Sequence, residues 1–317
     1  MTRRCFALGC CLIAIVGCEN SPPNSVTLPV DESFLDARGK HRPKPVSRPA
    51  DQYAIKQPPP KLFGIVKYKS PIGILQAYLT PDPKDGKKHP AIIWITGGDC
   101  NSIGDVWSQA DTDNDQSASQ YRKAGIVMMY PSLRGGNQNP GKRESFFGEV
   151  DDVLAARQRL SELPYVDPER IYLGGHSTGG TLVLLVAETG AKFRAVFSFG
   201  PVYDLSRYGA DFCHFDFANA EAVRVRSPIH WLRDIACPTL VIEGSIRGNL
   251  DSLEMLNAKC KNDMMKCYRI DRGNHFDILA PINTVLAQAI LKDTGRDCNI
   301  TLPTTPLGRL LPEELKK

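Results

Sequence analysis

The stretch from Ile171 to Glu188 places the tightest constraint on how this chain can fold. It opens with a short run of β-branched and apolar residues and closes with ten residues that favour an apolar helix. Between them lies Gly175-His-Ser-Thr-Gly179, which matches the pattern G-x-S-x-G. This order predicts a strand, a sharp turn and a helix, with Ser177 in a strained backbone conformation at the turn.

Ser177 is predicted to act as a nucleophile. Free N–H groups and the helix dipole at this turn would favour the negative charge that forms when a carbonyl is attacked. The alternative is a plain tight connection or a phosphate cradle, because the 26 glycines of the chain allow a chance match. The apolar strand directly before Ser177 and the continuous helix directly after it favour the nucleophile.

Apolar strands alternate with helical segments over residues 62–296, which are enough for one large domain. The predicted strands cover residues 63–68, 72–79, 91–96, 126–130, 193–199, 238–243 and 266–271, beside the one before Ser177. Helices are predicted at 146–163, after Ser177, from about 251 and at 281–292. Such alternation is typical of an α/β protein with a doubly wound, mostly parallel sheet. The section at about 201–236 has no long regular pattern and is predicted to form a small cap, and 297–317 a C-terminal tail.

His275 is the histidine best placed to take the proton of a serine nucleophile. It follows the last predicted strand, so it should lie at the same carboxyl edge of the sheet as Ser177, and its place after the serine in the chain also fits. The other histidines lie in the N-terminal segment, an early turn, the elbow and the cap section: His41, His89, His176, His214 and His230. Backbone N–H groups around Gly98 and Asp99, which end the strand at 91–96, are candidates to stabilise an oxyanion, with an ordinary Gly-Gly turn as the alternative.

The motifs taken together resemble the α/β-hydrolase domain of the prolyl-oligopeptidase-like serine hydrolases. They are Thr96-Gly-Gly98, Ser132-Leu-Arg-Gly-Gly136, the run from Val166 to Gly180, Arg226-Ser-Pro-Ile229, Cys237 to Ile242 and Gly273-Asn-His-Phe276. The resemblance covers about 62–292 and implies a serine nucleophile, a histidine base, and an oxyanion hole formed by the Thr178 N–H and one N–H near Gly98. The β-propeller of the oligopeptidases has no room in this chain.

The catalytic acid has three candidates. In the family it normally stands three residues after the glycine that ends the penultimate strand, where this chain has Arg247. An acid is needed to hold the imidazole in the right tautomer. Glu243 ends that strand and is favoured, Asp251 lies later in the same loop within an apparent capping box, and Asp204 follows the preceding strand.

The first 17 residues are expected to be a lipoprotein-type signal peptide. Arg3 and Arg4 precede an apolar run too short to span a bilayer comfortably, and Ile15-Val-Gly-Cys18 resembles a lipobox, which implies cleavage before Cys18 and acylation of that cysteine. A plain secretory signal is the alternative. Residues 18–61 are rich in proline and are predicted to be a disordered tether. We therefore expect an exported protein anchored by lipid in the bacterial cell envelope.

An exported protein can form disulfides, and six cysteines remain after the expected signal and lipid site. Their pairing is left open by the sequence, although Cys260 and Cys267 are close enough in the chain for a short-loop bridge. No metal site and no cofactor are expected, and the net charge of +4 is spread along the chain without a nucleic-acid patch. We predict a serine hydrolase of small esters or short peptides; the alternative is a non-catalytic binding protein with the same fold.

Overall fold

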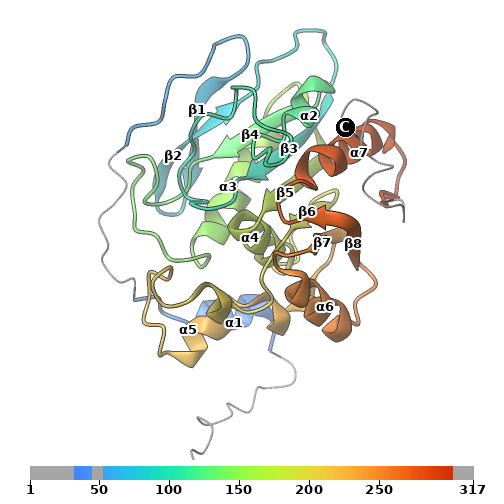
Figure 1. Ribbon diagram of the computed structural model, residues 1–317. Helices are drawn as coiled ribbons and strands as arrows, with labels where there is room; N and C mark the ends of the chain where they lie inside the picture. Colours follow the sequence, from blue (N-terminus) through green and yellow to red (C-terminus); the bar gives the residue numbers. More distant parts are fainter. Residues whose placement is uncertain (1–31, 45–52, 303–317) are drawn as a thin grey trace, which may run out of the picture. The chain divides into compact units, whose positions relative to one another are not determined.

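The computed structural model of the chain describes residues 32–44 and 53–302. Chain contacts separate Met1–Glu32 from Ser33–Lys317, and every described helix and strand lies in the second unit. Its centre is an eight-stranded sheet in the order β1-β2-β4-β3-β5-β6-β7-β8, drawn in Figure 1. The strands are β1 Gly64–Ser70, β2 Gly73–Leu79, β3 His89–Ile95, β4 Val127–Pro131, β5 Val166–His176, β6 Val196–Phe199, β7 Thr239–Ile246 and β8 Met265–Asn274. Only the pairs β1–β2 and β2–β4 are antiparallel, so six strands form a parallel sheet.

Helices cover both faces of the sheet. The longer ones are α3 Glu149–Ser161, α4 Thr178–Ala187, α6 Leu250–Lys259 and α7 Leu279–Lys292, with α2 Ser119–Lys123 as a short one. Alternate residues of β3 point to opposite sides: Ile93 belongs to the core cluster that includes residues of α3, α4 and α6, whereas Ile92 and Trp94 belong to the one that includes residues of α2 and α7. The central strands are therefore buried on both faces, which explains why they are apolar throughout.

The predicted strands are all present, with ends shifted by a few residues. One helix differs more: it was expected from Phe146 but begins at Glu149. Ser145 and Phe146 have positive φ angles of 49° and 75°, which a helix cannot accommodate, so they form a strained turn before it.

The section between β6 and β7 contains only short helices, in line with its lack of a long pattern. They are η1 Leu205–Tyr208, α5 Ala220–Arg224, η2 Pro228–His230 and η3 Leu232–Asp234. Trp231 is buried in the core and donates its indole N–H to the carbonyl of Arg224, so it does not line a ligand site.

The predicted tether is wrong over Phe34–Lys40, which form helix α1. Ser33 caps this helix, since its hydroxyl accepts the N–H of Asp36 at 3.1 Å. Phe34 is fully buried against Trp231, and Arg38 donates to the backbone oxygen of Phe147 at 2.5 Å and to the carboxylate of Asp151 at 2.8 Å. In Figure 1 α1 lies beside α5, a helix much later in the sequence. Packing against distant segments therefore orders a helix that seven residues alone would not form.

Replacing Phe34 with alanine is expected to lower the free energy of unfolding by about 3–5 kcal/mol, because it removes a fully buried ring from the core. Urea unfolding of a fragment that begins at Glu32 would measure this. Leu35, which is 55% exposed, provides the control, and its alanine variant should unfold like the parent. Equal stability of the Phe34 and Leu35 variants would mean that α1 contributes nothing to the fold.

Glu188, the residue after α4, is buried, and neither of its carboxylate oxygens has a hydrogen-bond partner. Burial raises its pKa well above the ordinary 4.5, and Asp234 and Cys260 add to the effect. The folded state then keeps a proton that the unfolded chain loses, so stability falls as pH rises from about 4.5 toward the folded-state pKa, by about 1.4 kcal/mol per pH unit. Glu188→Gln carries no titrating proton here, so its free energy of unfolding should not fall in this way. It should rise relative to that of the wild type as pH increases. A stability difference that is the same at every pH would contradict this.

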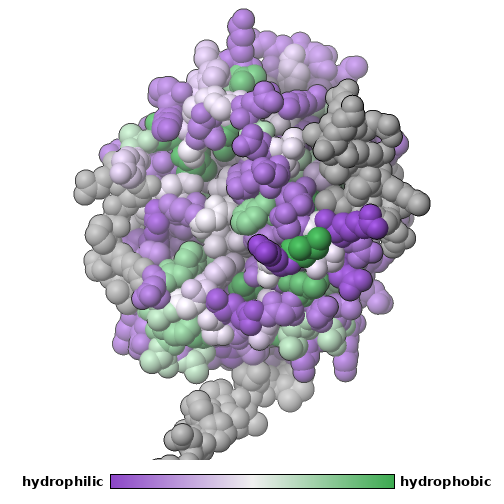
Figure 2. Space-filling view, viewed as in Figure 1, coloured by the Kyte–Doolittle hydropathy of each residue, from purple (hydrophilic) through white to green (hydrophobic). Residues whose placement is uncertain are grey.

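The face shown in Figure 2 is mostly hydrophilic, with apolar side chains in small separate groups. Within the described ranges, no helix has both the length and the apolar character needed to cross a membrane. Cys18 and the expected signal peptide lie outside the described residues.

The six cysteines from Cys100 onward are all free thiols, so the suggested Cys260–Cys267 bridge is absent.

Candidate active site

Ser177 stands at a sharp turn between β5 and α4, as predicted. Its φ and ψ angles of 54° and −113° lie outside the usual regions for a side-chain-bearing residue. The turn is this tight because α4 sits directly on the sheet: a Cβ on Gly179 would lie 2.3 Å from the oxygen of Ile95, and one on Gly180 would lie 2.2 Å from the oxygen of Phe199. Only glycine fits at either position, which fixes the elbow geometry.

His275 and Glu243 form a buried pair at the carboxyl ends of β8 and β7. Nδ1 of His275 lies 2.8 Å from Oε2 of Glu243, whose side chain is fully buried. The carboxylate also accepts the backbone N–H groups of Gly244 at 2.7 Å and Asn249 at 3.0 Å, which compensate for the loss of water around it. Because the carboxylate can only accept, Nδ1 carries the proton and Nε2 is left as the basic nitrogen.

The other two candidate acids have different partners. Asp251 forms an ion pair with Arg207, and Asp204 caps η1 by accepting the N–H of Ser206 at 2.8 Å. The capping box expected at Asp251 is also wrong, because the N-cap of α6 is Asn249. Of the three carboxylates, Glu243 is the one in contact with His275.

Ser177 and His275 meet the same short segment at the end of β6. The N–H of Ser177 donates to the oxygen of Phe199 at 2.8 Å. The next residue, Gly200, lies so close to the imidazole that a Cβ there would be 2.4 Å from Cε1 of His275. Within the described residues no direct hydrogen bond joins the Ser177 hydroxyl to His275. Such contacts are often long before substrate binds.

A cavity of about 480 Å³ opens beside Ser177. One wall is aromatic: the ring of Phe146 lies 5.8 Å from that of Tyr208 and 6.1 Å from that of Phe212. The lining also includes polar side chains, among them the ion pair between Arg143 and Asp99, at 2.8 Å. The full lining is Gly98, Asp99, Cys100, Asn101, Arg143, Ser145, Phe146, Ser177, Thr178, Tyr208, Asp211, Phe212 and His214.

The two predicted oxyanion residues also line this cavity. Gly98 has a φ of 74°, and its carbonyl accepts the Thr178 hydroxyl at 2.9 Å. Thr178 is the first residue of α4, where backbone N–H groups lack partners within the helix. The structure thus brings Ser177, Thr178 and Gly98 together around one space.

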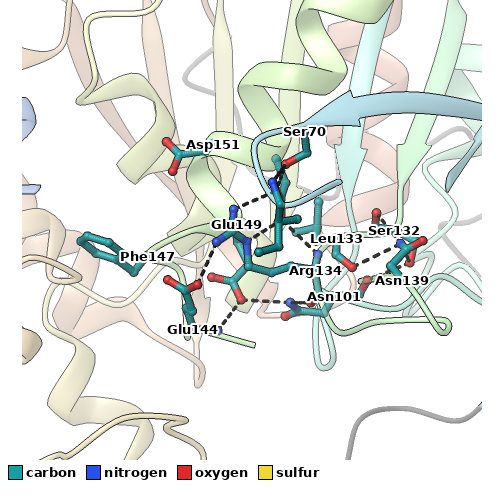
Figure 3. Close-up of polar contacts among 12 residues, drawn as sticks. Ser70, Asn101, Ser132, Leu133, Arg134, Asn139, Glu144, Phe147, Glu149 and Asp151 are labelled. Carbon is teal, nitrogen blue, oxygen red and sulfur yellow. Dashed lines mark hydrogen bonds and ion pairs between the residues drawn. The ribbon is translucent and has the colours of Figure 1, made fainter. Parts of the chain in front are cut away.

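A network of largely buried polar side chains, shown in Figure 3, includes Asn101 of the cavity lining. Arg134 binds the carboxylate of Asp152 through Nε at 2.9 Å and Nη2 at 3.0 Å, and that of Glu144 at 2.8 Å. The amide of Asn101 donates to the oxygen of Arg134 at 2.8 Å and to Glu149 at 3.0 Å. Burial raises the pKa of Glu149. This network fixes the loop after β3, including Asp99 and Asn101, to the start of α3.

Sequence reasoning missed most of these residues. Arg134 was noted only as part of a motif. Phe146 was expected to begin a helix, and Tyr208 and Phe212 lie in the predicted cap section, which has no regular pattern. Glu243 was not missed: it was favoured because it ends the strand next to the position where the family has its acid.

Residues 113–247, which include Ser177 and Glu243, match the model of the Prolyl oligopeptidase family. Dipeptidyl-peptidase 5 of Porphyromonas gingivalis is 26% identical over 192 residues, which cover 53% of this chain and 27% of that protein. The uncharacterized peptidase YtmA of Bacillus subtilis is 30% identical over 129 residues, which cover 40% of this chain and 47% of that protein. The chain therefore spans less than half the length of these two relatives.

Solved structures show the same architecture. The acylaminoacyl peptidase of Pyrococcus horikoshii superimposes with a TM-score of 0.59 at 19% identity, covering 77% of this chain and 44% of that one. The 2,6-dihydroxy-pseudo-oxynicotine hydrolase superimposes with a TM-score of 0.54 at 16% identity, covering 72% of this chain and 67% of that one. The predicted α/β-hydrolase fold is confirmed.

Proposed function

We propose that this chain is a serine hydrolase that cleaves short peptides, and esters of the same acyl groups, through an acyl-enzyme. The contact between Glu243 and His275 beside the strained Ser177 turn carries this proposal, because a buried imidazole with an oriented Nε2 is what a serine nucleophile requires. The match to the Prolyl oligopeptidase family supports the same chemistry.

In the proposed reaction Ser177 Oγ attacks the carbonyl carbon while Nε2 of His275 takes the hydroxyl proton. Glu243 stabilises the imidazolium that forms, and the N–H groups of Thr178 and Gly98 stabilise the oxyanion. The imidazolium then donates its proton to the leaving amine or alcohol, which departs and leaves an ester on Ser177. A water molecule, deprotonated by His275, attacks this ester and releases the acid.

The cavity indicates which substrates fit best. Phe146, Tyr208 and Phe212 present an apolar wall next to Ser177, and about 480 Å³ accommodates an aromatic side chain with its neighbouring peptide unit. We therefore propose a preference for an aromatic or large apolar residue on the acyl side of the cleaved bond.

A series of acyl-amino acid 4-nitroanilides and 4-nitrophenyl esters tests this proposal. The wild type should turn over the phenylalanine compounds at least about 10-fold faster, in kcat/KM, than the alanine compounds, and Phe212→Ala should reduce that ratio. Turnover that favours charged or small acyl groups would overturn the proposed specificity. Absence of turnover across both series would favour the binding protein instead.

We also propose that the protein is exported and held in the cell envelope by acyl chains on Cys18, on the strength of the lipobox-like Ile15-Val-Gly-Cys18. Metabolic labelling with a palmitate analogue should mark the wild type but not Cys18→Ser. Equal labelling of both proteins, or none of the wild type, would contradict the anchor.

A further inference from the structure

A chain of hydrogen bonds, part-buried at Gly97 and Gln116 and buried at His176, connects the loop after β3 with the loop that holds His275. The N–H of Gly97 donates to Oε1 of Gln116 at 2.9 Å. The amide nitrogen of Gln116 lies 2.8 Å from Nδ1 of His176, and Nε2 of His176 lies 2.8 Å from the backbone oxygen of His275. His176 is fully buried inside the elbow, directly before Ser177. One chain of hydrogen bonds therefore joins the loop after β3, which we call the oxyanion loop, the elbow around Ser177 and the loop that holds His275.

The direction of these hydrogen bonds fixes the protonation of His176. The N–H of Gly97 can only donate, so the oxygen of the Gln116 amide faces it and the NH₂ group faces His176. The carbonyl of His275 can only accept, so Nε2 of His176 carries a proton and Nδ1 is the acceptor. His176 is thus a neutral imidazole. Burial and the nearby His275 agree with this, since they lower the pKa of His176 to about 3.

The neutral state of His176 matters for the proposed base, His275, because the two rings are neighbours. The ring centroids of His176 and His275 lie 4.5 Å apart, and Glu243 contacts His275 through Nδ1. Among the described residues, the contacts of His176 with Gln116 and Phe276 are uncharged, and the titratable group facing it is His275. A cation at His176 would oppose the imidazolium that His275 must form.

We propose that Gln116 and His176 are positioning residues. They hold the oxyanion loop in a fixed position relative to His275 and keep a neutral ring beside His275. Asn101, in the network of Figure 3, secures the far end of the same loop, so the loop is fixed at Gly97 from one side and at Asn101 from the other. The kinetic consequence rests on the proposed hydrolase function, whereas the protonation of His176 does not.

Gln116→Ala removes both hydrogen bonds and is expected to lower kcat by about 10- to 100-fold while KM changes little, because the oxyanion loop shifts relative to His275. Gln116→Glu keeps an acceptor for Gly97 and offers a carboxylate to a protonated His176. Because a cation at His176 opposes the imidazolium of His275, kcat should fall as pH drops through the titration of His176, an additional limb that the wild-type profile lacks. Gln288→Glu, on the exposed side of α7, adds the same charge and should behave like the wild type.

Nitrogen-15 spectra of labelled histidine test the same proposal without turnover. In the wild type His176 should remain a neutral Nε2–H tautomer from about pH 5 to pH 9, and in Gln116→Glu it should titrate within that range. Wild-type kcat in Gln116→Ala, a Gln116→Glu profile without the extra limb, or wild-type titration of His176 would each overturn the proposal. If no substrate is found, the function fails, but the spectra still decide whether His176 is held neutral.

Discussion

Replacing Ser177 with alanine is expected to lower kcat by about 10⁶-fold, to the residual rate that the oxyanion donors and binding alone provide. The reason is that no other hydroxyl occupies the strained position between β5 and α4, so no acyl-enzyme can form. Rates with the phenylalanine ester under single-turnover conditions would measure the loss. The fold should survive, because alanine keeps the Cβ and fits the same turn.

The matched control is Ser161→Ala, at the far end of α3, which should keep the wild-type rate. A Ser177 variant that retains more than about one hundredth of the wild-type activity would mean that another group is the nucleophile, since intact triads lose far more.

The second large effect is expected for Glu243→Gln, with kcat reduced by about 10⁴-fold. The amide has the size of the carboxylate, but its NH₂ group donates where the carboxylate accepts. Nδ1 of His275, which now donates at 2.8 Å, would then have to accept, so the proton moves to Nε2 and the base is lost. The imidazolium of the transition state also loses its counter-charge.

Asp251→Asn serves as the control for Glu243→Gln, because Asp251 pairs with Arg207 away from His275. It should leave kcat and KM unchanged. If Asp251→Asn instead caused the large loss while Glu243→Gln did not, the acid would come from the first turn of α6, and the segment between β7 and α6 would have to rearrange in solution.

Much of the fold was predictable because the strands carry their own signal. β3, β4 and β6 are apolar runs, since helices bury both of their faces. Helix α1 was missed, because its two buried apolar residues, Phe34 and Ala37, have helical spacing but are too few to indicate a helix in a proline-rich stretch. Its order comes from contacts with Phe147 and Trp231, more than 100 residues away in the chain.

The site was predictable where local sequence decides the geometry. The elbow glycines follow from close approach of α4 to the sheet, and His275 from its place after the last strand. Glu243 was favoured because it ends the strand next to the position where the family has its acid, but only the fold shows that it, and not Asp204 or Asp251, contacts the imidazole. The Gln116–His176 contact links residues 60 apart, and no sequence period announces it.

The free cysteines are another feature that the sequence alone could not predict. Six cysteines permit three bridges by count alone, yet pairing depends on whether two sulfur atoms come within bonding distance. In this structure none of the six is joined in a disulfide, and three of them are buried: Cys100, Cys213 and Cys237. Counting cysteines in the sequence could not reveal this.

The most direct test of the central proposal is reaction with a fluorophosphonate, followed by mass analysis of the peptide that contains Ser177. We predict one phosphonyl group on Ser177 in the wild type, slow labelling in His275→Ala and Glu243→Gln, and none in Ser177→Ala. A folded wild-type protein that remains unlabelled, or that carries the group on another residue, would contradict a nucleophilic role for Ser177.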